Sequence, residues 1–179
     1  MYDPYRSFPY HYQYHPMYVR QPMYWFEDAN RINILPTTNQ SNYLKLKDNG
    51  PNPFVVNINT ASRQNNNYRM ALWTGHHLQV TLMSLKPGED IGLEIHPHLD
   101  QFLRIEKGRG VVQMGRSRDN LNFVKRVSDD SAIMVPAGTW HNVRNTGSSP
   151  LKLYSIYAPP QHPYGTVQAT KAQAMATGH

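Results

Sequence analysis

The sequence predicts an all-β fold, a single sandwich or barrel of short strands, and three observations lead to that prediction. Apolar and polar residues alternate from Leu78 to Met83, as expected for a strand with one face in a core. Turn-forming residues separate the apolar segments at intervals of about eight to twelve residues, which is typical of antiparallel β folds. The chain of 179 residues shows no internal repeat and is long enough for one domain with a sizeable core and extensions.

The first 26 residues differ from the rest of the chain. They hold seven of the twelve tyrosines and four prolines, but no leucine or isoleucine. Because they have neither a helical nor a strand period, we expect a flexible Tyr/Pro-rich arm over 1–26. Two interpretations stay open: a poorly packed extension, or an adhesive arm that lays aromatic rings against a partner. The composition also resembles some spore-coat proteins.

We expect residues 27–67 to form an irregular segment that precedes the barrel. INIL at Ile32 is its one apolar island and can add an edge strand. Asn57 suits the N-cap of a helix of about two turns, which the asparagines from Asn65 onward would end. The barrel itself is expected over 68–160, and the polar segment 161–179 is expected to fray as a C-terminal tail.

The barrel strands are predicted from short apolar segments between turns. KPGED at Lys86, the segment 116–120, AGT at Ala137 and TGSSP at Thr146 supply turns. The predicted strands are ALWTG from Ala71, HLQVTLMSL from His77, two strands that carry His96 and Gln101, GRGVVQMG from Gly108, LNFVKRV from Leu121, SAIMVP from Ser131, HNVRN from His141 and LKLYSIYA from Leu151.

Composition excludes several classes of function. Without cysteine, the chain has no disulfide, thiolate metal site or cysteine nucleophile, so any metal must use nitrogen and oxygen ligands. No window approaches eighteen apolar residues and no secretory signal is recognisable, so we expect a cytoplasmic protein with no membrane partner. The net charge of +6 permits polyanion binding, but the basic residues are scattered. Their one dense group, at 116–126, is expected to be a solvated hairpin tip rather than a nucleic-acid site.

Two sequence blocks predict a metal site. GLEIHPHLDQFLRIEKG begins at Gly92 and VPAGTWHN begins at Val135. His96 and His98 are two residues apart, so on a strand they would share one face. Gln101 follows across a short turn, on the predicted inward face of the next strand, and His141 starts another strand. Imidazoles that converge on one point usually hold a transition metal.

These blocks resemble the two motifs of the cupin superfamily. The first motif is written G(X)5HXH(X)3,4E(X)6G, and Gly92, His96, His98, Gln101 and Gly108 are assigned to its landmarks. The second, G(X)5PXG(X)2H(X)3N, is similar to the segment that holds Pro136, Gly138, His141 and Asn145, with Ser131 near its opening glycine. In this assignment two gaps of the first motif are too short, and glutamine stands where the motif has glutamate.

The resemblance implies a fold and a set of partners. It implies a single cupin barrel, a double-stranded β-helix or jelly roll, with an irregular N-terminal extension and one short helix before it. DQFLRIEKG, VPAGTWHN and HPYGT are similar to small single-domain bacterial cupins of the mannose-6-phosphate-isomerase-like type, over 57–171. The family implies a homodimer and a small-molecule ligand.

For the site, the resemblance implies one divalent transition metal, with Fe, Mn, Ni, Zn and Cu all open. The expected ligands are His96, His98, His141 and Gln101, although Gln101 can instead support a ligand histidine. Glu94 shares the parity of His96 and is the candidate catalytic acid or base; a rim carboxylate paired with a lysine or arginine is the alternative.

Two functions follow from these expectations. One is a metal-dependent enzyme of oxygenase or isomerase type that acts on a small oxygenated or sugar-like molecule. The other is a non-catalytic cupin, either a spore-coat-like assembly component or a small-molecule binder. A fold alone does not choose between them.

Overall fold

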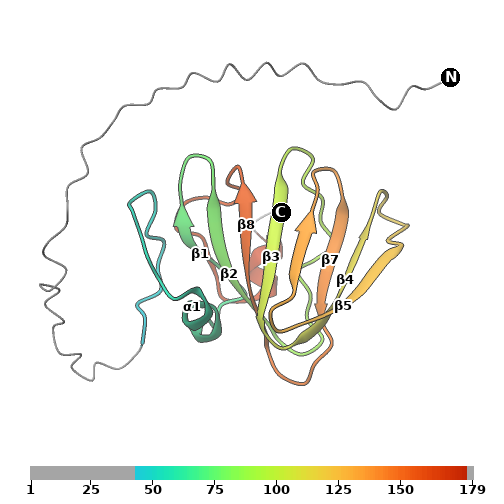
Figure 1. Cartoon of the computed structure of the whole chain (residues 1–179), viewed down its shortest axis with the longest axis horizontal. Helices are drawn as coiled ribbons and strands as arrows, with labels where there is room; N and C mark the ends of the chain where they lie inside the picture. The colour runs from blue at the N-terminus through green and yellow to red at the C-terminus, as the bar shows by residue number, and fades with distance from the viewer. Residues whose placement is uncertain (1–42, 177–179) are drawn as a thin grey trace, which may run out of the picture. The chain divides into compact units, whose positions relative to one another are not determined.

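Two antiparallel sheets make up the fold in the computed structural model, which describes residues 43–176 (Figure 1). The six-stranded sheet runs in the order β6 (Ala132–Val135), β3 (Asp100–Lys107), β8 (Leu151–Ala158), β2 (Gln79–Leu85), β1 (Arg69–Thr74) and β9 (Val167–Gln168). The three-stranded sheet runs in the order β5 (Phe123–Ser128), β4 (Arg109–Gly115) and β7 (Trp140–Asn145). The all-β prediction is confirmed.

Apolar side chains on the facing sides of the two sheets form the main core. In β3, Gln101, Leu103 and Ile105 point inward and are buried, so the predicted inward face of this strand is confirmed. The same core contains two residues of the large sheet, Met83 and Leu153, and two of the small sheet, Val112 and Val143, all at most 2% exposed. A one-residue slip of any such strand would exchange its inner and outer faces, so burial fixes the register.

A short helix covers the outer face of the large sheet. Helix α1 (Ile58–Gln64) begins after Asn57, whose side chain accepts a hydrogen bond from the backbone of Thr60, and ends at Asn65. Both ends agree with the sequence prediction. Ala61 packs against Leu82 and its neighbours in a second apolar cluster. Strand β2 is therefore buried on both faces.

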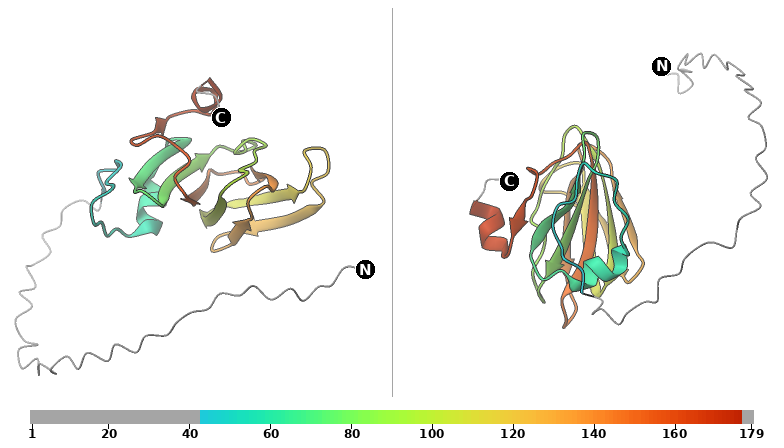
Figure 2. Two further views of the ribbon diagram at one scale, coloured as in Figure 1. Left: turned by 90° about the horizontal axis from the view of Figure 1, so that it is seen from above. Right: turned by 90° about the vertical axis from the view of Figure 1, so that its left-hand side faces the viewer.

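The C-terminal segment is more ordered than the sequence predicted. Residues 167–168 pair with β1 as β9, and helix α2 (Lys171–Ala176) follows. In both views of Figure 2, α1 and α2 lie on opposite sides of the large sheet. Ala174 is buried in the main core, and Lys171 Nζ lies 2.5 Å from Asp90 Oδ1. The expectation that this segment frays is wrong, because these contacts hold it against the barrel.

One predicted strand is replaced by an irregular segment. The chain before β3 pairs only through isolated bridges, Asp90 with Arg144 and Glu94 with His141, and Pro97 and His98 form a turn. The predicted arm (1–26) and the edge strand at Ile32 lie outside the described residues. Within 43–176, no helix is long and apolar enough to cross a membrane.

Candidate metal centre

Three side chains bring their ligand atoms together inside the barrel. The donor atoms of Glu94, His96 and His141 all lie within 4.8 Å of one another. Glu94 Oε1 is 3.3 Å from His141 Nε2 and 3.6 Å from His96 Nε2. These three atoms are buried and have no hydrogen-bond partner among residues 43–176. Buried polar atoms without partners are costly, so the cluster fits a cation that would bind all three.

Backbone hydrogen bonds join the two sequence blocks at this point. Glu94 N donates to His141 O at 3.1 Å, and His141 N donates to Glu94 O at 3.0 Å. Gly138, with φ of 75°, donates its N–H to His96 O at 2.9 Å. Segments more than forty residues apart in sequence thus hold the three ligand candidates in a fixed relation.

The tautomer of His141 is set by its backbone neighbour. Its Nδ1 lies 3.0 Å from the carbonyl oxygen of Thr139. Because a carbonyl oxygen only accepts, Nδ1 must carry the hydrogen, and Nε2 keeps its lone pair in the neutral ring. This orientation of a histidine by a second partner is common at metal sites.

Glu94 supplies the negative charge of the cluster. Burial alone raises the pKa of its carboxyl group, but the neighbouring His141 and His96 and the charge of Arg69 outweigh it and lower that pKa to about 2. Glu94 is therefore a carboxylate at neutral pH. A group with this pKa is a good ligand and a poor general base.

Gln101 is the fourth ligand candidate, and its side chain points into the barrel. Its side chain is 3% exposed, and Nε2 donates to Ser155 Oγ at 2.9 Å. That bond uses the amide nitrogen. The amide oxygen is buried and has no hydrogen-bond partner among the described residues, so it could bind a metal. Gln101 thus fits either of the two roles that the sequence left open.

The structure does not bring His98 into the cluster. It lies in the turn after Pro97 and is exposed. The expectation that His96 and His98 share a strand face is wrong, because the extended segment ends at His96. The shared face belongs to Glu94 and His96 instead.

A shift of the first motif explains this result. If Gly88 is taken as the opening glycine, five residues lead to Glu94, one to His96, four to Gln101 and six to Gly108, so every spacing agrees with the motif. Glu94 then stands in the place of the first histidine. In the second motif, the opening glycine corresponds to Asp130, whose φ of 68° is in the left-handed region that glycine favours. The motif spacings alone could have shown both corrections.

Sequence reasoning missed two further residues beside the cluster. Arg69 on β1 is buried, and its Nη2 lies 3.9 Å from Glu94 Oε2. Tyr157 on β8 is buried with its ring edge-on to His96, at 5.7 Å between ring centroids. Burial raises the pKa of the Tyr157 hydroxyl, so it stays protonated. Tyr157 lies on the predicted strand from Leu151, so its inward parity was an available signal, whereas Arg69 precedes the predicted strand from Ala71.

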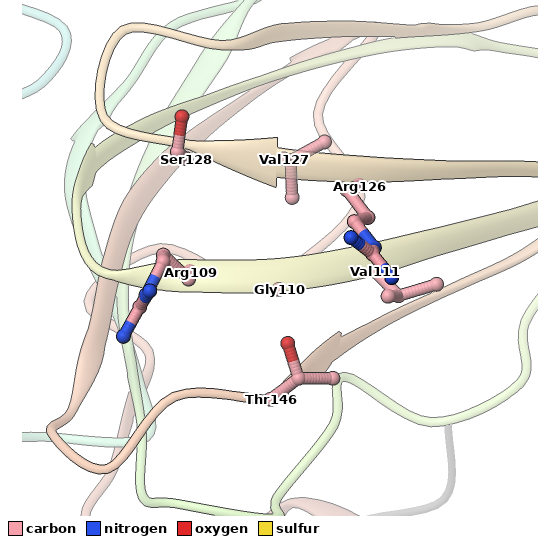
Figure 3. A pocket seen from close by; sticks show the side chains of 7 residues that line it. All are labelled: Arg109, Gly110, Val111, Arg126, Val127, Ser128 and Thr146. Carbon is pink, nitrogen blue, oxygen red and sulfur yellow. The ribbon is translucent and has the colours of Figure 1, made fainter.

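A separate hollow of about 570 Å³ lies on the outer face of the small sheet (Figure 3). Arg109 and Arg126 line it together with the hydroxyl groups of Ser128 and Thr146. Their chemistry suits an anion, but these side chains are all exposed, and within the described residues none has a buried atom without a partner. The barrel interior is the better candidate site.

Comparisons with known proteins agree with this architecture. A family model described as "Cupin domain" matches residues 81–157. The chain is 61% identical to the uncharacterized protein YrkC of Bacillus subtilis, over 98% of this chain and 97% of YrkC. It is 40% identical to protein L612 of Acanthamoeba polyphaga mimivirus, over 70% of this chain and 77% of L612.

A solved structure is also similar. The crystal structure of BH2720 from Bacillus halodurans superposes with a TM-score of 0.73 at 71% identity, over 73% of this chain and 99% of BH2720. The Cupin domain match, the two facing sheets and both motifs lead to one assignment. The chain belongs to the cupin superfamily.

Proposed function

We propose that this protein is a metal-dependent cupin enzyme that acts on a small oxygenated molecule, with oxygenase chemistry favoured over isomerisation. The observation that carries the proposal is the set of two histidines and one carboxylate in Glu94, His96 and His141. This combination is typical of non-haem Fe(II) oxygenases. In this proposal Glu94 is a ligand, not the general acid or base that the sequence suggested.

In this proposal the residues of the cluster and Gln101 have separate roles. Glu94, His96 and His141 hold the ion, and Gln101 supplies a fourth oxygen or leaves that position to substrate. A bound divalent ion would act as a Lewis acid and, if it is redox-active, as the site of O₂ activation. The Glu94 side chain is 20% exposed, so in this proposal a small molecule would approach the cluster from the side of Glu94.

Metal analysis of matched variants tests the proposal. Protein purified without a histidine tag should hold about one equivalent of a single metal. His96→Ala, His141→Ala and Glu94→Ala should each lose most of it, whereas His98→Ala is the matched control and should keep it. Protein that stays metal-free after loading with excess Fe(II), Mn(II), Ni(II) or Zn(II) would contradict the metal site.

A second measurement addresses the type of chemistry. Nitric oxide is a substitute for O₂ that needs an open position on Fe(II), and its adduct has a distinct EPR signal. We expect that signal in the Fe(II)-loaded parent and its loss in His141→Ala. A full Fe(II) complement with no adduct would favour the isomerase type over the oxygenase type.

An apolar surface among the described residues supports the homodimer that the family implies. A hollow of about 400 Å³ on β6, β3 and β8 is lined by Phe102, Met134 and Ile156, and Met134 is 66% exposed. No residue of α1 or α2 lines it. A second copy would remove this apolar surface from water. Met134→Lys should therefore shift the mass measured by light scattering from dimer to monomer.

The second candidate function is a non-catalytic component of an assembly, which the Tyr-rich segment 1–26 favours. Deletion of 1–26 should then change the oligomer size or the retention in the host assembly, including the spore. Unchanged size and retention would remove the support for an adhesive arm, while metal binding would stay unaffected under the first proposal.

A further inference from the structure

We propose that the metal centre takes a small organic acid, with a carboxylate next to a second metal-binding oxygen, and that Arg69 selects for this carboxylate. The inference rests on the proposed metal site and adds the class of its ligand. It follows from the contacts of Arg69, from the charge of the loaded site and from the position of Glu94 between the two.

Arg69 is an incompletely paired cation inside the barrel. It is 2% exposed, and its Nη1 donates to Gln168 Oε1 at 3.2 Å. Its Nη2 lies 3.9 Å from Glu94 Oε2, which is an ion pair but too long for a hydrogen bond. Its Nε is buried and has no acceptor among the described residues. The planar guanidinium group thus keeps a donor for an acceptor that the described residues do not supply.

The charge of the loaded site calls for an anion. Glu94 and Arg69 carry opposite charges that cancel. A histidine that binds a metal does so as a neutral ring, and Gln101 is an amide. Asp90, the next carboxylate along the segment, is already paired with Lys171 at 2.5 Å. The charge of a divalent ion would therefore stay uncompensated in a buried site, which is unfavourable. A ligand that brings negative charge would remove that cost.

Glu94 sets the spacing of the two binding groups. Its Oε1 faces His96 and His141, while its Oε2 faces Arg69. The metal position and the guanidinium group are thus separated by about the width of one carboxylate. A ligand that bridges them needs its two oxygen groups on adjacent carbons, as in 2-oxo and 2-hydroxy acids. The fork of the guanidinium group matches a carboxylate with two parallel hydrogen bonds.

Calorimetry on the metal-loaded full chain tests this inference. Pyruvate and 2,3-butanedione are the matched probes, because they share the 2-oxo group and differ in the carboxylate. We expect Zn(II)-loaded parent protein to bind pyruvate at least about tenfold more tightly than butanedione, as a charge-assisted pair implies. Arg69→Met should lose that preference, and Arg69→Lys should keep part of it.

The controls separate the possible failures. Metal content is measured first in every protein, so loss of metal from the parent counts against the proposed function and not against the role of Arg69. A fully loaded parent that binds both probes equally, or an Arg69→Met variant that still prefers pyruvate, would overturn the inference. Tighter binding of inorganic phosphate than of pyruvate would overturn the assignment to carboxylates. If Arg69→Met does not fold, the parent's preference and the Arg69→Lys variant still decide the question.

Discussion

In the proposed site, where Gln101 is the fourth ligand, replacing it with glutamate would add one negative charge beside the metal with almost no change in shape. The side chain is 3% exposed, and its amide oxygen has no partner within residues 43–176. The amide nitrogen now donates to Ser155 Oγ at 2.9 Å. In the variant, the Ser155 hydroxyl can rotate and donate to the new carboxylate, so the contact survives with its direction reversed.

The expected gain follows from the charges. Two unit charges about 4 Å apart attract by about 4 kcal/mol at an effective dielectric constant of about 20. Burial of a carboxylate costs several kcal/mol, which offsets much of the attraction to a divalent ion. We expect a net gain of about 1.4 to 2.8 kcal/mol, or about 10- to 100-fold tighter metal binding. The metal-free variant should be less stable than the metal-free parent, because two carboxylates then share the cluster.

Competition with a chelating dye measures the affinity, and thermal unfolding with and without metal measures the two stabilities. Gln101→Leu is the control, since it removes the amide oxygen without adding charge and should not bind metal more tightly. A folded Gln101→Glu variant with parental or weaker affinity would refute the placement of Gln101 beside the ion. The same variant should also weaken pyruvate binding, because it supplies the charge that the ligand would bring.

Three further predictions concern stability. A Cβ added at Gly110 would lie 2.6 Å from the carbonyl oxygen of Arg144, so Gly110→Ala should destabilise the protein by about 2 kcal/mol in urea denaturation. Asn57→Ala should cost about 1 kcal/mol through loss of the α1 cap, whereas Asn57→Asp should retain it. The pKa of Glu94 is lowered from 4.5 to about 2, so its contribution is present above pH 4.5 and is lost as the pH falls toward 2. That shift corresponds to about 3 kcal/mol, and metal-free Glu94→Gln should show a flatter stability profile between these pH values.

The sequence predicted the strands best where one face is buried and the turns are short. In β3 the inward parity of Gln101, Leu103 and Ile105 was correct, because burial leaves one register possible. The cap at Asn57 was correct for a local reason, since a cap depends on residues three apart. Such features need no knowledge of distant contacts.

The errors lie where distant segments decide the structure. The strand through His96 was predicted to continue to His98, but its pairing depends on the backbone bonds between Glu94 and His141, which local patterns do not reveal. The C-terminal segment was expected to fray because it is polar, yet it pairs with β1 through two residues and buries Ala174. Arg69 lies beside Glu94 for the same kind of reason, because the fold brings β1 close to a segment about 25 residues further along the chain.

The corrected motif also changes the meaning of Gln101. In the first assignment, glutamine at the place of the motif's glutamate left the site without a carboxylate. With Glu94 in the place of the first histidine, the negative charge of the ligand set is retained, and one imidazole is exchanged for an amide. The carboxylate is now that of Glu94, whose Oε2 lies 3.9 Å from Arg69 Nη2. Part of its charge is therefore shared with a buried guanidinium group, and in the proposed site a bound ion would keep more of its own charge for an anionic ligand. In the proposed site Gln101 and Arg69 would act in the same direction, since Gln101 lacks the negative charge of a glutamate and Arg69 adds a positive charge beside the same ion.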